Sequence, residues 1–177
     1  MNQSQNESIR LLRDVDAYVI PAGDEVKLLA GNLVKITQSL GGNYTVLING
    51  NLVQIRDENA DALGFKISKK ENKKKHEGTF EQQIWDQLKT CYDPEIPVNI
   101  VELGLIYDLQ IEKNNDVNVK MTLTAPGCGM GPVLTEEVNR KISGLNDSNN
   151  VKVELVWEPQ WNRDMMSEEA QLELGML

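Results

Sequence analysis

One cysteine lies where a thiol could do chemistry. Cys128 stands between two glycines in the segment TLTAPGCGMGP, residues 122–132, which follows an alternating strand pattern and precedes a helical one. Because Pro132 suits a first helical position, we expect Cys128 just ahead of a helix N-terminus. Unpaired backbone N–H groups and the helix dipole favour an anion there and lower the pKa of a thiol. The segment therefore predicts a functional thiolate, although a buried, inert cysteine in a tight turn fits the same pattern.

Few other residues could share this chemistry. Cys91 falls on one helical face with Ile84 and Leu88. This spacing predicts that Cys91 is a core residue rather than a metal ligand. His76 is the only histidine and lies in a lysine-rich stretch. Ser-His-Asp triads, Cys-His pairs and zinc sites with two or more histidines therefore cannot be built within one chain unless lysine or a carboxylate replaces the imidazole. A nucleophilic Cys128 would lack its usual base, so we expect no enzyme.

Two carboxylates lie on a loop that prolines stiffen. Asp93 and Glu95 open the run DPEIPVNIVELGLIYD, residues 93–108, between a predicted helix and a predicted strand. Such carboxylates cap loops, and they also serve as hard metal ligands or proton acceptors. Both roles stay open, because the sequence does not establish that this loop lies near Cys128.

The domain that positions these groups is predicted to span residues 78–177. Thr79 and Gln82 form a capping-box pattern, Asp93 and Pro94 end the first helix, and Asn99 begins a single turn. Periodicity then predicts strands at 105–112, 117–124 and 151–157 and helices at 132–143 and from 167. This order favours a two-layer α/β sandwich with helices on one side of a mostly antiparallel sheet.

The segment after the last strand is rich in large side chains. Trp157, Trp161, Met165 and Met166 come before the final helix. They could mark a surface for a partner protein, and they could equally cover the open sheet. We expect covering to be their main use.

Residues 1–67 are predicted to form a small all-β, barrel-like domain. Turn residues separate five short strands at 17–20, 25–29, 33–40, 44–48 and 52–56. Gly41-Gly42 and Asn49-Gly50 supply the positive φ angles that tight hairpins need. No catalytic group gathers in this domain, so we expect a scaffold, dimerisation or partner-binding role. Together the two domains predict an α+β protein.

A charged segment separates the two predicted domains. Residues 68–77 hold five lysines and two glutamates and no apolar residue, which favours a solvated linker over a nucleic-acid patch. The whole chain has a formal net charge of −9, which disfavours nucleic acid and anionic membranes as partners. No stretch is apolar enough to span a bilayer, and the polar start lacks the features of a signal peptide. We therefore expect a cytoplasmic protein.

The central motifs resemble those of a known family. The segments 93–108 and 122–132 resemble the metal-sulfur cluster biosynthesis domain of PaaD-like and SufT-like proteins. The N-terminal runs IPAG, ITQSLGGNYTV and DADALG resemble the long form within the SufT branch. The resemblance implies an iron-sulfur cluster assembly-like domain and a role in maturing iron-sulfur proteins. It implies that Cys128 is the family's distinctive cysteine.

The same resemblance implies a set of ligands and partners. The family's acidic loop positions fall on Asp93, Glu95 and Glu102, which are the expected metal ligands beside Cys128. A cluster normally needs four thiolates, and this chain has two cysteines, so we expect the cluster to be bound only transiently. We also expect that the chain does not need a cluster in order to fold. A homodimer, a small thiol or a partner's cysteines would complete the ligation. The expected partners are iron-sulfur assembly proteins and apo client proteins, and the alternative is a metal-free adaptor between them.

Overall fold

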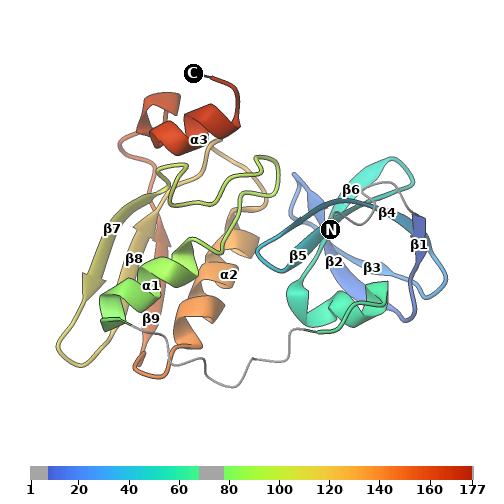
Figure 1. Cartoon of the computed structure of the whole chain (residues 1–177), viewed down its shortest axis with the longest axis horizontal. Helices are drawn as coiled ribbons and strands as arrows, with labels where there is room; N and C mark the ends of the chain where they lie inside the picture. The colour runs from blue at the N-terminus through green and yellow to red at the C-terminus, as the bar shows by residue number, and fades with distance from the viewer. Residues whose placement is uncertain (1–7, 68–77, 177) are drawn as a thin grey trace. The chain divides into compact units, whose positions relative to one another are not determined.

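The computed structural model describes residues 8–67 and 78–176. The chain divides into two compact units, Met1–Lys74 and Lys75–Leu177, and each has its own core of buried apolar side chains (Figure 1). The predicted linker at 68–77 lies outside the described residues. Within the described ranges, no helix is both long and apolar enough to cross a membrane.

The first unit is a six-stranded antiparallel sheet in the order β1-β4-β5-β6-β2-β3. Its strands are β1 Ser8–Arg10, β2 Val15–Ile20, β3 Glu25–Leu28, β4 Leu33–Leu40, β5 Asn43–Ile48 and β6 Asn51–Ile55. All five predicted strands are confirmed to within two residues. Gly41-Gly42 and Asn49-Gly50 have positive φ angles and join β4 to β5 and β5 to β6, as expected.

Two elements of the first unit escaped the sequence analysis. Strand β1 is three residues long, too short for a periodic pattern, and is held by its pairing with β4. A 3-10 helix, η1 at Asp57–Leu63, follows β6. Arg13 anchors η1 through a 2.6 Å ion pair with Asp61, a contact that links residues far apart in sequence. Local periodicity therefore carried no signal for either element.

The second unit has two layers, with helices α1 and α2 packed on one face of the sheet β7-β8-β9 (Figure 1). Its elements are α1 Phe80–Leu88, β7 Ile106–Ile111, β8 Val117–Met121, α2 Gly131–Ser143, β9 Val151–Leu155, η2 Arg163–Met165 and α3 Glu168–Glu173. Strands β7 and β8 are antiparallel, but β9 lies parallel to β8 because α2 crosses between them. The sheet is therefore mixed rather than mostly antiparallel.

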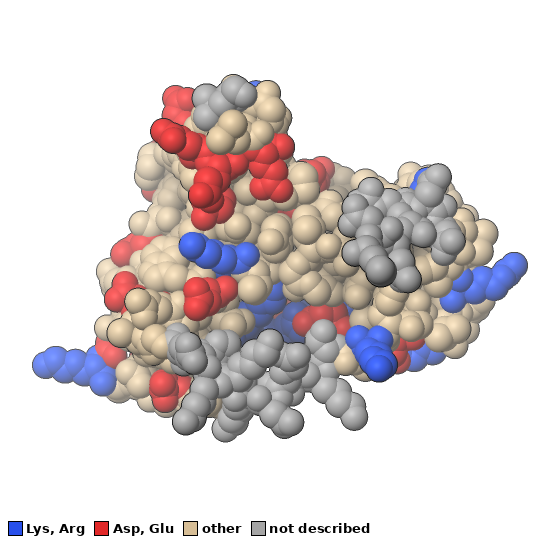
Figure 2. All heavy atoms as spheres, viewed as in Figure 1, with Lys and Arg blue, Asp and Glu red and all other residues tan. Residues whose placement is uncertain are grey.

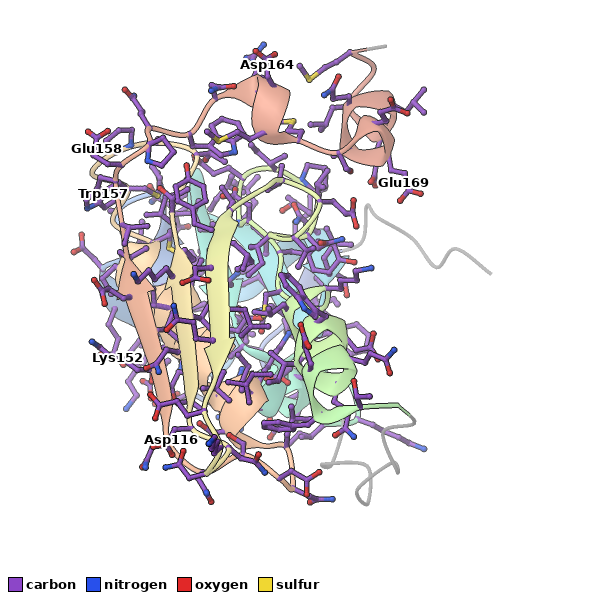
Figure 3. The ribbon with its side chains drawn as sticks, turned by 90° about the vertical axis from the view of Figure 1, so that its left-hand side faces the viewer. Asp116, Lys152, Trp157, Glu158, Asp164 and Glu169 are labelled. Carbon is purple, nitrogen blue, oxygen red and sulfur yellow. The ribbon has the colours of Figure 1, made fainter. Side chains whose placement is uncertain are left out.

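The two faces of this sheet differ in chemistry. The face toward the helices carries the buried Val117, Val119 and Met121 of β8, which pack with Ile84 and Leu88 of α1 and with Leu134, Val138 and Ile142 of α2. The register places polar side chains on the opposite face, among them Asp108, Lys120 and Glu154 in one cross-strand row. Figure 3 views the sheet with β9 at its left edge. One face thus builds the core and the other meets solvent.

The first helix begins as predicted. The Thr79 hydroxyl accepts the backbone N–H of Gln82, and the Gln82 side chain accepts the backbone N–H of Thr79. This reciprocal capping satisfies two backbone donors that a helix start leaves unpaired. The capping box therefore sets the beginning of α1.

The segment after β9 packs back over the turn before β7. The Trp161 indole donates a 2.8 Å hydrogen bond to the Leu103 carbonyl oxygen, and the Ser167 backbone N–H donates to the Glu102 carbonyl oxygen. Trp161 and the buried Met166 pack against the core beside this turn, so they cover one end of the core and not, as predicted, the open face of the sheet. Trp157 differs, since its side chain is 43% exposed.

Candidate functional site

Cys128 lies on the loop that leaves β8 and enters α2. Its backbone N–H donates to the Ala125 carbonyl oxygen at 3.3 Å, and its own carbonyl accepts the N–H of Gly131 at 3.1 Å. Gly127 has a φ of 78°, a conformation that favours glycine. Because Met130 is the N-cap of α2, Cys128 stands two residues before that cap. Its predicted position ahead of a helix N-terminus is confirmed.

The start of α2 is packed tightly onto the ends of two strands. A Cβ added at Gly131 would lie 2.9 Å from Leu123 Cδ1 and 3.3 Å from Leu155 Cδ1. Both distances are shorter than ordinary contacts, so only glycine fits there without movement. This packing holds the loop of Cys128 at the end of the sheet where β8 and β9 finish.

The thiol of Cys128 is partly exposed and packs against the edge of the core. Burial is the largest influence on its pKa and raises it, and the nearby Asp93 and Glu95 raise it further. The backbone N–H of Met130 donates to the sulfur and lowers the pKa, but does not outweigh these effects. The expected lowering of the pKa is therefore wrong, because desolvation and two carboxylates oppose the helix start.

The loop of Asp93 and Glu95 lies near Cys128, which the sequence had left open. Asp93 and Glu95 lie near enough to Cys128 to disfavour its thiolate. Asp93 also caps its own loop, because its Oδ1 accepts the N–H groups of Glu95 at 2.9 Å and Ile96 at 3.0 Å. Burial raises the pKa of the Asp93 carboxyl despite these bonds. Asp93 is thus both a loop cap and a neighbour of the thiol.

Glu102 occupies a different place. It lies in the turn that Asn99 begins, where the Asn99 side chain accepts the N–H groups of Val101 and Glu102. It is not among the carboxylates that shift the pKa of Cys128. Across residues 8–67 and 78–176, no three His, Cys, Asp or Glu side chains are arranged to hold a metal ion.

Cys91 is a core residue, as predicted. Its side chain is 0% exposed, and its Sγ donates to the Gln87 carbonyl oxygen at 3.7 Å. Burial raises the pKa of the Cys91 thiol to about 12. Since the chain has two cysteines, Cys128 carries the one thiol that solvent can reach.

A groove that the sequence analysis missed lies at the same end of the sheet as the Cys128 loop. It has a volume of about 660 Å³, and its lining includes Ile106, Tyr107, Lys120, Val156, Glu158 and Met165. Trp157 and Glu158 project together at the end of β9 (Figure 3). The sequence offered one signal, the run of large side chains at 157–166 that includes the lining residue Met165, but the groove itself forms from segments about fifty residues apart.

Comparisons with known proteins agree with this architecture. The model of a family described as iron-sulfur cluster assembly protein matches residues 81–155. A Fe-S protein maturation auxiliary factor of Porphyromonas gingivalis is 50% identical over 97 residues, which cover 55% of this chain and 92% of the relative. The Fe-S protein maturation auxiliary factor SufT of Staphylococcus aureus is 38% identical over 84 residues, covering 48% of this chain and 96% of the relative.

A solved structure is also similar. The crystal structure of a DUF59 domain from Bacillus anthracis is 35% identical, with a TM-score of 0.52, and the match covers 55% of this chain and 93% of that chain. The matched family model lies within the second unit, so the likeness of the first unit to the long SufT form stays a prediction. These matches cover nearly the full length of each relative. The chain belongs to the family of iron-sulfur cluster assembly proteins.

Proposed function

We propose that this chain is a non-catalytic accessory factor in Fe-S protein maturation, which binds an iron-sulfur cluster or iron transiently at Cys128 and delivers it to apo client proteins. The observation that carries the proposal is the contrast between the two thiols. Cys128 is partly exposed on a glycine-rich loop, whereas Cys91 is sealed in the core. The names of the relatives from Porphyromonas gingivalis and Staphylococcus aureus, both maturation auxiliary factors, support the same role.

One accessible thiol per chain determines what kind of binding is feasible. A cluster is normally held by four thiolates, so Cys128 alone supplies a minority of the ligands. A second copy of the chain, a small thiol or cysteines of a partner would provide the others. Such incomplete ligation leaves positions that an acceptor protein can occupy, which suits transfer better than storage.

The raised pKa of Cys128 defines how binding would start. A thiol with a raised pKa keeps its proton at neutral pH, so iron must displace that proton when it binds. Binding would therefore release a proton and strengthen as the pH rises. The protonated resting form also reacts slowly with electrophiles and oxidants, which argues against a nucleophilic enzyme.

Carboxylates are the proposed additional ligands. Asp93 Oδ1 already accepts two backbone N–H groups, and Oδ2 makes no hydrogen bond within the described part of the chain. Oδ2 is therefore the atom available to iron. Glu95 is exposed on the same loop and near the thiol, whereas Glu102 has the weakest support because it does not act on Cys128.

Anaerobic reconstitution with ferrous iron and sulfide tests the proposal. Iron and sulfide per chain, the absorption spectrum and the oligomeric state are compared for the wild type, Cys128→Ser and Cys91→Ser. We expect Cys128→Ser to lose the bound iron and sulfide. Cys91→Ser is the matched control, because it removes the buried thiol and should retain them.

The outcomes separate the carrier from the adaptor. Equal iron and sulfide in the wild type and in Cys128→Ser would overturn the carrier proposal and leave the metal-free adaptor. Asp93→Asn, Glu95→Gln and Glu102→Gln, tested in the same way, assign the carboxylates. In cells, a Cys128→Ala strain should lose activity of iron-sulfur enzymes under high demand for clusters, and normal activity would contradict the role of the thiol.

A further inference from the structure

We propose that strand β3 of the first unit is the contact through which two copies of this chain form a symmetric homodimer. The two β3 strands lie antiparallel and join their sheets into one. The inference deepens the proposed function and rests on it for its purpose, because a second copy brings a second Cys128 into the same assembly. The contact itself is argued from the first unit alone and is measured without metal.

Strand β3, Glu25–Leu28, is an edge strand of the six-stranded sheet. On one side it pairs with β2, in a register that places Ala17 opposite Val26 and Tyr18 opposite Glu25. On its other side, no strand of the described residues pairs with it. Such an edge presents unpaired backbone groups that can accept another strand.

The hydrogen bonds to β2 determine which backbone groups of β3 stay open. The Val19 N–H donates to the Asp24 carbonyl oxygen at 2.9 Å, so these two residues form a hydrogen-bonded pair. Hydrogen-bonded pairs recur at every second residue of an antiparallel ladder, which turns the backbone groups of Val26 toward β2 as well. Glu25 and Lys27 therefore direct their N–H and C=O groups outward, where nothing in the described part of the chain bonds to them.

The side chains of β3 alternate between apolar and charged. Val26 packs against the core of the first unit and Leu28 is buried, whereas Glu25 and Lys27 are exposed. Asp16 stands opposite Lys27 on β2 without forming an ion pair with it. Neither Glu25 nor Lys27 has an ion pair or a side-chain hydrogen bond among the residues that the structure describes. Both charges are therefore available to a partner.

One register of two antiparallel β3 strands uses all of these groups. Residues opposite each other lie on the same face of the sheet, and the outward backbone groups must meet. Two Glu25 residues, or two Lys27 residues, placed opposite each other would satisfy the backbone but bring like charges together. Glu25 placed opposite Lys27 satisfies the backbone and pairs opposite charges. The strand thus complements itself about a two-fold axis at Val26, which identifies a second copy of the chain as the occupant.

The charge of the first unit permits two copies to meet there. Residues 8–67 hold six Lys and Arg against seven Asp and Glu, a net charge of −1, whereas the whole chain carries −9. Figure 2 shows Lys and Arg beside Asp and Glu on the visible face of the first unit, and acidic side chains gathered at the C-terminal end of the second. Repulsion between copies is therefore weakest where two first units face each other.

The size of the contact predicts a reversible dimer. Each pair of Glu25 and Lys27 exchanges both backbone hydrogen bonds and adds an ion pair across the strands. A contact between two four-residue strands is smaller than the interfaces of stable complexes. The dimer should therefore form and dissociate readily, and its population should depend on protein concentration.

Sedimentation equilibrium of the full-length chain tests the dimer. The wild type is measured over a range of concentrations at physiological salt, with a reducing agent and without metal, and we expect a monomer–dimer equilibrium. Glu25→Lys and Lys27→Glu each place like charges opposite each other in both pairs, so each should weaken the dimer about tenfold. A wild type that stays monomeric at every concentration, or species larger than a dimer, would overturn the proposal.

Exchange of the two charges tests the register. In an equimolar mixture of Glu25→Lys and Lys27→Glu, one chain carries two lysines on β3 and the other carries two glutamates, so every pair again joins opposite charges. The mixture should dimerise about as strongly as the wild type, although neither variant does so alone. The double variant Glu25→Lys/Lys27→Glu restores the pairs within one sequence and should dimerise too. Recovery shows that the variants are folded, and failure of either to recover the dimer would overturn the proposal.

Matched controls separate this contact from a general effect of charge. Asp147→Lys and Lys113→Glu make the same changes of charge at exposed positions of the second unit. Both should leave the dissociation constant within about twofold of the wild type at physiological salt. Equal losses in these controls and in the β3 variants would overturn the proposal.

Amide hydrogen exchange examines the backbone of the contact directly. The Lys27 N–H points outward, so in the wild type it should exchange more slowly at high protein concentration than at low concentration. The Val26 N–H faces β2 and should be protected at both concentrations. Exchange of the Lys27 amide that is independent of concentration would contradict the pairing of the strands.

The two proposals fail separately. Cys128→Ser should keep the dimer, because the contact does not involve the thiol. A wild type that binds iron and sulfide but stays monomeric would count against the β3 contact alone. A Cys128→Ser variant that dimerises and binds as much iron and sulfide as the wild type would count against the carrier alone.

Discussion

Tyr107 donates its hydroxyl hydrogen to the carbonyl oxygen of Pro159, 52 residues away, at 2.8 Å. The bond ties the segment after β9 to strand β7 and holds one wall of the groove. Tyr107→Phe should therefore lower the free energy of unfolding by about 1 kcal/mol, measured by urea denaturation. Tyr92→Phe is the control, because the Tyr92 hydroxyl makes no hydrogen bond within the described residues. Equal losses in both variants would show that the bond contributes nothing specific.

Gly104 should tolerate no side chain. Its φ is 70°, and a Cβ would overlap the Met165 carbonyl oxygen. Gly104→Ala should cost about 2–4 kcal/mol, the sum of left-handed strain and overpacking. Gly175 has the same φ with open space around it, so Gly175→Ala isolates the strain and should cost about 1 kcal/mol. Similar midpoints of denaturation for the two variants would contradict the close packing.

The capping box of α1 offers a test of local stability. Thr79→Ala removes the hydroxyl that accepts the Gln82 N–H, and we expect a loss of about 1 kcal/mol. Thr79→Ser keeps a hydroxyl at the same place and should stay near the wild type. Thermal or urea unfolding of both variants measures the difference, and a wild-type midpoint for Thr79→Ala would show that the cap is dispensable.

The pKa of Cys128 predicts a pH dependence. Burial, Asp93 and Glu95 raise this pKa, so the reactive thiolate appears only as the pH rises above the range of an ordinary thiol. Alkylation by iodoacetamide should be slower than that of free cysteine at neutral pH and accelerate steadily with pH. Glu95→Gln removes one negative charge, lowers the pKa and should speed the reaction about twofold at low salt. Cys91 should react only after unfolding.

Two results would contradict this account of the thiol. A rate at neutral pH above that of free cysteine would mean that the helix start dominates after all. A Glu95→Gln variant slower than the wild type would mean that Glu95 acts on Cys128 as a base rather than as a repelling charge. Mass spectrometry of the alkylated chain identifies which cysteine has reacted.

Much of the fold was readable from local patterns. The Thr79 capping box, the hairpin dipeptides and the helix after Pro132 were all predicted, because caps, turns and periodicity act over a few residues. Cys91 was assigned to the core from helical spacing alone. The family resemblance rested on two short motifs and is confirmed by the matches in the second unit.

The features that the sequence left open depend on contacts between distant segments. The amino-acid sequence determined by itself that Cys128 would follow a strand and precede a helix. Only the tertiary structure decided that Asp93 and Glu95 stand beside it, that its sulfur packs against the core, and that its pKa therefore rises. The same holds for the groove, whose walls come from β7 and the segment after β9. Periodicity in the sequence indicates which side of a helix or strand is buried. The pKa of a side chain and the walls of a groove depend instead on which elements pack together, and long-range contacts determine that packing.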